Sequence, residues 1–374
     1  MIRCIHITPE LPPTVGGVAD YTAILSRRLV EESDGAVEPV RVHSGKQQGG
    51  TIEGDFPVGN LSGEQSARRL AAAVQELAHE AEEDAVVLLE YSGYGYAKRG
   101  APWWVARGLR RVCGGEEIPL ITMFHEISAS GPVWTSAFWL SPVQSWIAWQ
   151  ITRLSDGITT THPTGASQIG QWADDDTSVE VTPAFSNVGE PTERPPLSER
   201  CPQAVIFGGQ RTKTAIYETH CAVTQKALEE WGIQTVVDVG PPGAATPERL
   251  EIDVEVRGIQ PVEAISELLL DTQAGILHYP AAYATKSGIL AAYMAHGVVP
   301  LLVDPEPLGG RLGAGEHFAL ADVTKKENAG RIAQQTTAWY DRHVHSRRAA
   351  RTILDLTESA ISPPAVDISQ GRIL

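Results

Sequence analysis

The sequence predicts an α/β protein of two domains, each formed around a mainly parallel sheet, and three observations lead to this prediction. The chain has 374 residues, more than one core of ordinary size encloses. Short apolar runs typical of buried strands alternate with segments of helical period, which is the rhythm of βαβ units. The rhythm stops once, at residues 186–202, where Pro191, Pro195 and Pro196 stand among charged residues, and then resumes.

The first half contains four apolar runs with the length and composition of buried strands. They are residues 3–8, 86–90, 119–124 and 157–161. Apolar residues with helical spacing follow the first run and precede the second: Val18, Tyr21, Leu25 and Leu29, then Leu70, Val74, Leu77 and Ala81. Because such stripes form one face of a helix, we expect each to cover a face of the sheet.

The second half repeats the pattern after the proline-rich segment. Its strand-like runs are residues 204–207, 235–239, 254–256, 274–277 and 298–303. Polar helical segments follow residue 324, and the tail with Pro363 and Pro364 is expected to be poorly ordered. We therefore expect an N-terminal domain at 1–188, a linker at 189–202, a C-terminal domain at 203–335 and C-terminal helices at 336–374.

Composition limits the partners and the compartment. With 30 Lys and Arg against 46 Asp and Glu, the net charge of −16 opposes binding to nucleic acid. The four cysteines show neither a CxxC pair nor a metal-type spacing with histidine, so we expect no metal site, no disulfide framework and a cytoplasmic location. The sequence shows no export signal and no run of about 18 apolar residues, and it leaves membrane association open without indicating it.

The first strand leads into a turn that reads TPELPPTVGGVADY over residues 8–21. Gly16 and Gly17 directly precede the expected helix. Paired glycines let the backbone approach a ligand, and the N–H groups of a helix N-terminus attract an anion. The alternative is a plain tight turn.

His125 and Glu126 follow the strand-like run at 119–124. Open α/β sheets bind ligands outside the carboxyl ends of their strands, so this pair is a candidate for a site. The alternative for His125 is a capping or buried, hydrogen-bonded role.

A carboxylate and phenols follow the strand-like run at 86–90. Glu90, Tyr91 and Tyr94 carry chemistry suited to stacking on a sugar or other polyol acceptor and hydrogen-bonding to it. The alternative is a tyrosine-rich packing loop.

Six of the nine tryptophans gather in one part of the first half: Trp103, Trp104, Trp134, Trp139, Trp146 and Trp149. They could line an acceptor cleft or lie at a membrane interface, although packing is the commoner explanation. The acidity of the chain opposes a membrane role, and a local basic patch would weaken that objection.

Two segments of the second half combine a cation with a turn. Gly209, Arg211 and Lys213 follow its first strand, where a guanidinium and an ammonium could hold phosphate. A solvated surface turn is the alternative. Farther on, residues 285–288 open a helix and offer Thr285, Lys286, Ser287 and the amide of Gly288 to an anion.

These motifs resemble those of family-4-like (group 1) glycosyltransferases. The first turn is similar to the family's PP-x-x-GG-V-A-x-Y opening, His125 and Glu126 to its strand-terminal His-Asp pair, and residues 284–300 to its donor-binding signature ending in A-M-A-x-G-x-P-V. The resemblance spans almost the whole chain. It implies a GT-B fold, in which two Rossmann-like domains face each other across a cleft and a final helical segment crosses back onto the first domain.

The resemblance also implies a reaction in polysaccharide or glycoconjugate biosynthesis. A hexose would pass, with retention, from a nucleoside diphosphate sugar to the hydroxyl of a saccharide, lipid-linked or small-molecule acceptor, with no metal and no cofactor besides that co-substrate. His125 would contact the donor sugar, and Glu126 and Glu90, with Tyr91 and Tyr94, would position the acceptor. The donor diphosphate would bind Gly16, Gly17, Gly209, Arg211, Lys213, Thr285, Lys286, Ser287 and Gly288.

The sequence departs from the family at one important point. Ala284 and Ala292 occupy the positions of the two glutamates of its E-x7-E pattern, which contact the donor sugar and ribose in the family. A catalytically silent GT-B-like binding or scaffold protein is therefore the competing hypothesis. A third is another GT-B enzyme, such as a sugar-nucleotide epimerase or a phosphorylase.

Overall fold

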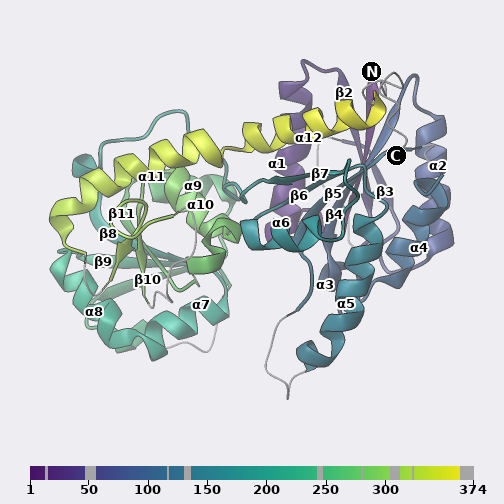
Figure 1. The fold of residues 1–374 in the computed structure, drawn as a ribbon. Coiled ribbons are helices and arrows are strands. Elements are labelled where there is room, and N and C mark those ends of the chain that lie inside the picture. The colour runs from purple at the N-terminus through teal and green to yellow at the C-terminus, as the bar shows by residue number, and fades with distance from the viewer. Residues whose placement is uncertain are drawn as a thin grey trace, which may run out of the picture. The chain divides into compact units, whose positions relative to one another are not determined.

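The computed structural model of the protein describes residues 1–12, 16–46, 56–115, 118–129, 136–241, 247–279, 281–303, 312–321 and 324–362. The chain divides into two compact units. The first comprises Met1–Thr182 and the C-terminal segment that starts at Ala349, and the second comprises Pro183–Arg348. Each unit contains one parallel sheet with helices packed on it, so the expected α/β class is confirmed (Figure 1).

The first unit contains a seven-stranded parallel sheet in the order β3-β2-β1-β4-β5-β6-β7. The strands are β1 (Ile2–Thr8), β2 (Val37–His43), β3 (Val58–Asn60), β4 (Ala85–Ser92), β5 (Leu120–Glu126), β6 (Gly157–Thr160) and β7 (Ser178–Val181). The helices are α1 (Gly17–Glu32), α2 (Ala67–His79), α3 (Gly93–Tyr96), α4 (Trp103–Val112), α5 (Ser136–Thr152) and α6 (Pro163–Gly170). The chain moves outward from β1 to β3 and then returns to β4, on the other side of β1.

The alternation of side chains along β1 and β4 separates an apolar face from a polar one. Ile5 and Ile7 pack with Val87 and Leu89 in the main core cluster, to which α2, α4 and α5 contribute. The intervening His6 points to the opposite face, where it meets Ser26 of α1. A buried polar layer therefore lies under α1.

The sequence prediction did not include β2, β3 or β7. β2 carries Pro39, which cannot donate a ladder hydrogen bond and so argues against a central strand. The structure accommodates it because β3 pairs with β2 only from Arg41 to His43, so Pro39 pairs on one side alone, with Cys4 of β1.

The second unit contains a six-stranded parallel sheet in the order β10-β9-β8-β11-β12-β13. Its strands are β8 (Cys201–Phe207), β9 (Thr235–Val239), β10 (Asp253–Gly258), β11 (Thr272–Leu277), β12 (Val299–Leu302) and β13 (Ala319–Leu320). Its helices are α7 (Gln210–Thr214), α8 (Cys221–Glu230), α9 (Val262–Leu270), α10 (Gly288–Ala295) and α11 (Ala329–His343). The strand order reverses between β8 and β11, as it does between β1 and β4.

The boundary between the units lies after Thr182, so the proline-rich residues 189–202 belong to the second unit. Side-chain hydrogen bonds fix this segment. Glu190 accepts a hydrogen bond from the Tyr340 hydroxyl at 2.7 Å and another from the backbone N–H of Ser346 at 2.6 Å. The segment is therefore part of a packed structure.

Helix α12 (Ser346–Ile361) begins in the second unit and enters the first at Ala349. Within the first unit it packs on the sheet, because Leu356 lies against Gly157 of β6, where an added Cβ would meet it at 3.1 Å. Arg351 also bonds to Glu32 at the end of α1. No helix in the described part of the chain is long and apolar enough to cross a bilayer. Pro363 and Pro364 lie outside the described residues.

Candidate active site

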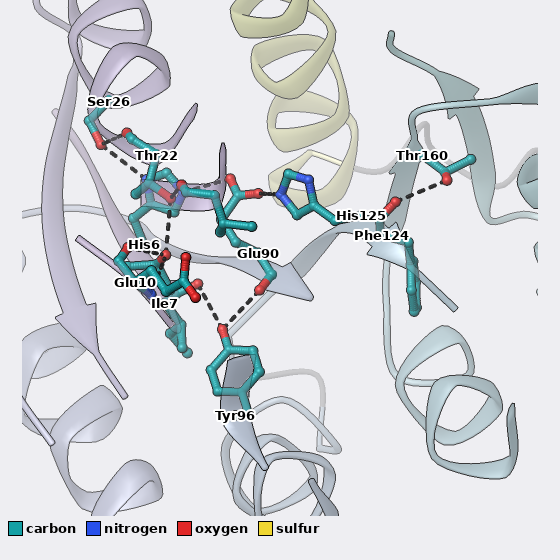
Figure 2. Close-up of polar contacts among 12 residues, drawn as sticks. His6, Ile7, Glu10, Thr22, Ser26, Glu90, Tyr96, Phe124, His125 and Thr160 are labelled. Carbon is teal, nitrogen blue, oxygen red and sulfur yellow. Dashed lines mark hydrogen bonds and ion pairs between the residues drawn. The ribbon is translucent and has the colours of Figure 1, made fainter. Parts of the chain in front are cut away.

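Three neighbouring strands of the first sheet bring two histidines and a glutamate together near their carboxyl ends. His6 lies in β1, Glu90 in β4 and His125 in β5. Figure 2 shows the Glu90 carboxylate between the two rings: His6 Nε2 lies 2.8 Å from Oε1, and His125 Nε2 lies 2.6 Å from Oε2. The cluster stands where the strand order reverses, which is where open α/β sheets bind ligands.

The hydrogen bonds around His6 define where its protons lie. Ser26 Oγ donates to the carbonyl oxygen of Thr22 at 2.9 Å, so toward His6 it can only accept. His6 Nδ1 therefore carries a proton and donates it to Ser26 Oγ at 3.1 Å. The carboxylate of Glu90 has no proton to give, so His6 Nε2 is the donor in its contact with Glu90 Oε1.

Glu90 is a fixed acceptor for the His125 ring. Burial raises the pKa of Glu90, but hydrogen bonds and positive charge from His125 and His6 outweigh burial and lower this pKa from 4.5 to about 2. The Tyr96 hydroxyl holds the Glu90 backbone by donating to its carbonyl oxygen at 2.9 Å. Because Nε2 of His125 donates to the carboxylate, Nδ1 is the ring nitrogen left for a ligand.

His125 is the member of this cluster that reaches the surface, with 13% of its side chain exposed. The ring of Tyr21, from α1, packs edge-on against it at a centroid distance of 5.0 Å. The adjacent Glu126 is exposed. This arrangement places an oriented imidazole and a solvated carboxylate side by side at the end of β5.

The expected acceptor residues are placed differently. Glu90 and Tyr91 are fully buried, and the Tyr91 ring packs on Phe124 at a centroid distance of 5.1 Å. Glu90 therefore holds the two histidines, and Tyr91 belongs to the core. Their contacts with an acceptor stay a prediction. Tyr94 is half-buried, and its hydroxyl accepts a hydrogen bond from Gln144 Nε2 at 3.2 Å.

The paired glycines lie at the start of α1, as expected. Gly16 is the N-cap residue and Gly17 the first residue of the helix. The carboxylate of Glu10 lies beside Gly16, at 2.5 Å from the place a Cβ would take, whereas the space at Gly17 is open. A negative group at this position interacts favourably with the helix N-terminus and would compete with a phosphate for it. Residues 13–15 of the turn lie outside the described residues.

In the second unit, the two cations after β8 differ in environment. Arg211 is exposed on α7, which follows Gly209 and has only five residues. Lys213 is buried, forms an ion pair with Asp238 and donates to the carbonyl oxygen of Pro241 at 3.1 Å. Lys213 is therefore already part of a buried ion pair, whereas its contact with a donor diphosphate stays a prediction.

The segment after β11 forms a second candidate anion site. Ser287 is the N-cap of α10, and its hydroxyl accepts a hydrogen bond from the N–H of Leu290 at 3.1 Å. Gly288 is the first residue of the helix. Lys286 is half-buried, with Nζ 5.9 Å from the centroid of the Tyr283 ring.

The two segments of the second unit are brought together because β8 and β11 are neighbours. An added Cβ at Gly208 would lie 3.2 Å from Ile289 in the first turn of α10. The backbone of Thr285 is held in place, because its carbonyl oxygen accepts a hydrogen bond from the N–H of Ala184 at 2.9 Å. Arg211 and Lys286 thus come from adjacent strand ends of one sheet.

The two alanines that depart from the family pattern are both buried. Ala284 lines a small, mainly apolar cavity together with Thr285 and Trp339, and Ala292 lies in the interior of α10. The cavity has a volume of about 10 Å³, enough for about one water molecule. It does not accommodate a nucleotide.

Sequence reasoning missed two residues of the first unit, His6 and Glu10. His6 interrupts an apolar strand, and a polar residue in a strand buried on both faces is a signal that it has a partner. Glu10 carried no comparable signal, because its position beside Gly16 depends on the path of the turn.

Comparisons with known proteins agree with this architecture. Neither a protein-family model nor a curated protein matches the chain. Among solved structures, it is similar to a glycosyltransferase from Rickettsia africae, with a TM-score of 0.60 and 11% identity, over 97% of this chain and 99% of that one. It is also similar to Anabaena Alr3699/HepE in complex with UDP-glucose, with a TM-score of 0.59 and 12% identity, over 96% and 99% of the two chains.

A third similar structure is a candidate UDP-N-acetylglucosamine 2-epimerase from Listeria monocytogenes, with a TM-score of 0.58 and 12% identity, over 100% of this chain and 99% of that one. The likeness extends over nearly the whole length in each case. The chain therefore has the two-domain α/β architecture of the GT-B fold, as its sequence motifs implied.

Proposed function

We propose that the protein is a glycosyltransferase that moves a sugar from a nucleoside diphosphate sugar to a hydroxyl acceptor. The observation that carries the proposal is the buried Glu90, which orients His125 at the strand-order reversal of the first sheet. Solved structures of the same fold include a glycosyltransferase and a complex with UDP-glucose, so UDP-glucose is the first donor to test.

The proposed reaction retains the configuration of the anomeric carbon and requires no metal. The bond from this carbon to the diphosphate oxygen breaks, and its electron pair leaves with the diphosphate. The acceptor oxygen forms the new bond on the same face of the sugar, and its proton passes to the departing phosphate oxygen. Stabilising the charge that develops on the diphosphate is the main task of the protein in such a step.

Each unit has its own part in this proposal. In the second unit, Arg211, Lys286 and the first N–H groups of α10 neutralise the diphosphate. In the first unit, His125 contacts the donor sugar through the ring edge that carries Nδ1, while Glu126 positions the acceptor hydroxyl. Glu90 acts through His125 by fixing the orientation of its ring.

The first experiment measures thermal stabilisation of the full chain by a panel of UDP-, GDP-, ADP- and dTDP-sugars. A ligand at a hundred times its Kd stabilises the native state by about 2.7 kcal/mol, which raises the melting temperature. We expect one nucleotide to produce this shift, and Arg211→Ala to reduce it. Arg331→Ala is the matched control, because Arg331 is an exposed arginine on α11.

Release of the nucleoside diphosphate in the presence of acceptors then tests for turnover. If no sugar nucleotide shifts the melting temperature at about millimolar concentration, the donor site is refuted. The competing proposal, a catalytically silent GT-B-like binding protein, rests on the buried Ala284 and Ala292. It predicts weak or no binding of sugar nucleotides and no turnover with any acceptor.

A further inference from the structure

Helix α5 of the first unit has aromatic side chains exposed on one side. We use the name aromatic face for Phe138, Trp139, Val143, Trp146 and Trp149 of α5. Their spacing places all five on one side of the helix, since residues three, four and seven apart share a face. Trp139 is 72% exposed and Trp146 is 44% exposed. Tryptophans at the surface in this number require an explanation beyond packing.

Helix α4 lies beside α5 and extends this face with an aromatic ring and cations. The ring of Trp103 stacks obliquely on Trp146 at a centroid distance of 4.3 Å. Arg107 and Arg110 follow Trp103 at helical spacing on the exposed side of α4. Arg110 reaches α5 itself, donating to Gln150 Oε1 at 2.9 Å. The arginines therefore border the aromatic face.

The charge of this region is opposite to that of the whole chain. The sequence contains no Asp or Glu at residues 91–115 or 127–155, whereas the chain as a whole has a net charge of −16. The first of these stretches carries five cations: Lys98, Arg99, Arg107, Arg110 and Arg111. Neither of the two sequence stretches that contain α4 and α5 therefore contributes a carboxylate, and the first contributes five cations.

We propose that the aromatic face and its bordering arginines bind the surface of an anionic lipid bilayer. Tryptophan rings are stable at the boundary between headgroups and acyl chains, because one edge is apolar and the other is polar. Arginines next to them attract acidic headgroups, and the effect is local, so the net charge of the chain does not prevent it. The absence of charge in α5 allows that helix to lie at this depth.

A second copy of the chain fits the same face less well. A twofold dimer through α5 would bring the arginines of both copies into one interface, where like charges repel. An acidic bilayer supplies the complementary charge without such repulsion. The inference goes beyond the proposed function, because it concerns where the protein works and does not depend on the sugar that is transferred.

The test measures co-sedimentation of the full chain with vesicles. One preparation contains phosphatidylcholine alone, and the other contains about one third phosphatidylglycerol. We expect binding to the anionic vesicles, weakened by salt, and at least about tenfold weaker binding to the neutral ones. The double variant Trp139→Ser/Trp146→Ser and the variant Arg107→Glu should each lower binding to anionic vesicles about tenfold.

Matched controls distinguish binding through the aromatic face from non-specific adsorption to vesicles. Val256→Ser/Ile259→Ser removes two exposed apolar side chains of the second unit, and Arg331→Glu reverses an exposed charge there. Both should bind anionic vesicles as the wild type does. Circular dichroism and stabilisation by sugar nucleotides should be unchanged in all four variants, so a failure of the donor site is distinguished from a failure at this face.

Three outcomes overturn the inference. One is equal binding to the two vesicle types, or none to either. Another is unchanged binding of Trp139→Ser/Trp146→Ser to anionic vesicles. The third is a dimer in sedimentation velocity that this double variant dissociates, because the aromatic face would then be a contact between copies of the chain.

Discussion

At the level of single residues, the stability of the first unit depends on how the buried charge of Glu90 is compensated. A carboxylate without solvent is strongly destabilising unless it is paired and hydrogen-bonded. Glu90 satisfies this condition with a histidine on each oxygen, and His6 in turn is held by Ser26. The arrangement fixes the His125 ring, and Glu90 itself is fully buried.

The depressed pKa of Glu90 makes the stability of the first unit depend on pH. Because the folded-state pKa is about 2 against 4.5, Glu90 stabilises the native state above pH 4.5. The contribution, about 3 kcal/mol, is lost as the pH falls from about 5 to 2. We expect urea unfolding of Glu90→Gln to lack this decline, because the amide does not titrate there. A variant that loses stability over this range as steeply as the wild type would contradict the assignment.

Removing Lys213 and removing Arg211 should have different effects on the stability of the second unit. Lys213→Ala leaves the buried Asp238 carboxylate without its cation, and we expect a loss of about 3–5 kcal/mol in urea unfolding. Arg211→Ala removes an exposed side chain, so stability should change by less than about 0.5 kcal/mol. The second variant should instead lose stabilisation by sugar nucleotides. Equal stability of the two variants would refute the distinction.

At the level of secondary-structure elements, helix termini after strand ends determine where anions can bind. The start of α1 has the Glu10 carboxylate beside it, while the start of α10 is capped by the neutral hydroxyl of Ser287. The second terminus is therefore the better place for a diphosphate, and Lys286 adds a cation next to it.

Substitutions of Ser287 separate the capping of α10 from ligand binding. Aspartate is as good an N-cap residue as serine, so Ser287→Asp should retain the stability of the wild type. Its negative charge should abolish stabilisation by sugar nucleotides. Ser287→Ala should lower the unfolding free energy by about 1 kcal/mol and retain a weaker nucleotide effect. Thermal melts with and without nucleotide measure both quantities, and unimpaired nucleotide binding by Ser287→Asp would contradict the proposed site.

At the level of the whole molecule, the last helix connects the second unit with the sheet of the first. The part of α12 beyond Ala349 belongs to the first unit, where Leu356 is buried against Gly157. The C-terminal segment is thus required to complete a core whose other elements lie in the first half of the chain.

Truncating that contact should affect one unit only. Leu356→Ala should destabilise the first unit by about 2–5 kcal/mol, because it leaves a cavity over β6. Hydrogen exchange should then lose protection in Met1–Thr182 while Pro183–Arg348 keeps it. Glu358→Ala, at an exposed position of the same helix, is the control. Equal loss of protection in both units would show that they do not unfold separately.

The sequence by itself determined the α/β class, most long strands and the places where loops could bind ligands, because these follow from periodicity and from local glycine and proline chemistry. It predicted His125 and Gly16 at element ends, where the structure has them. Tertiary structure alone decided which polar groups share a site. The sequence does not show that β1, β4 and β5 are neighbours, so it could not predict the contacts of Glu90 with His6 and His125. The ion pair between Lys213 and Asp238 likewise depends on the pairing of β8 with β9.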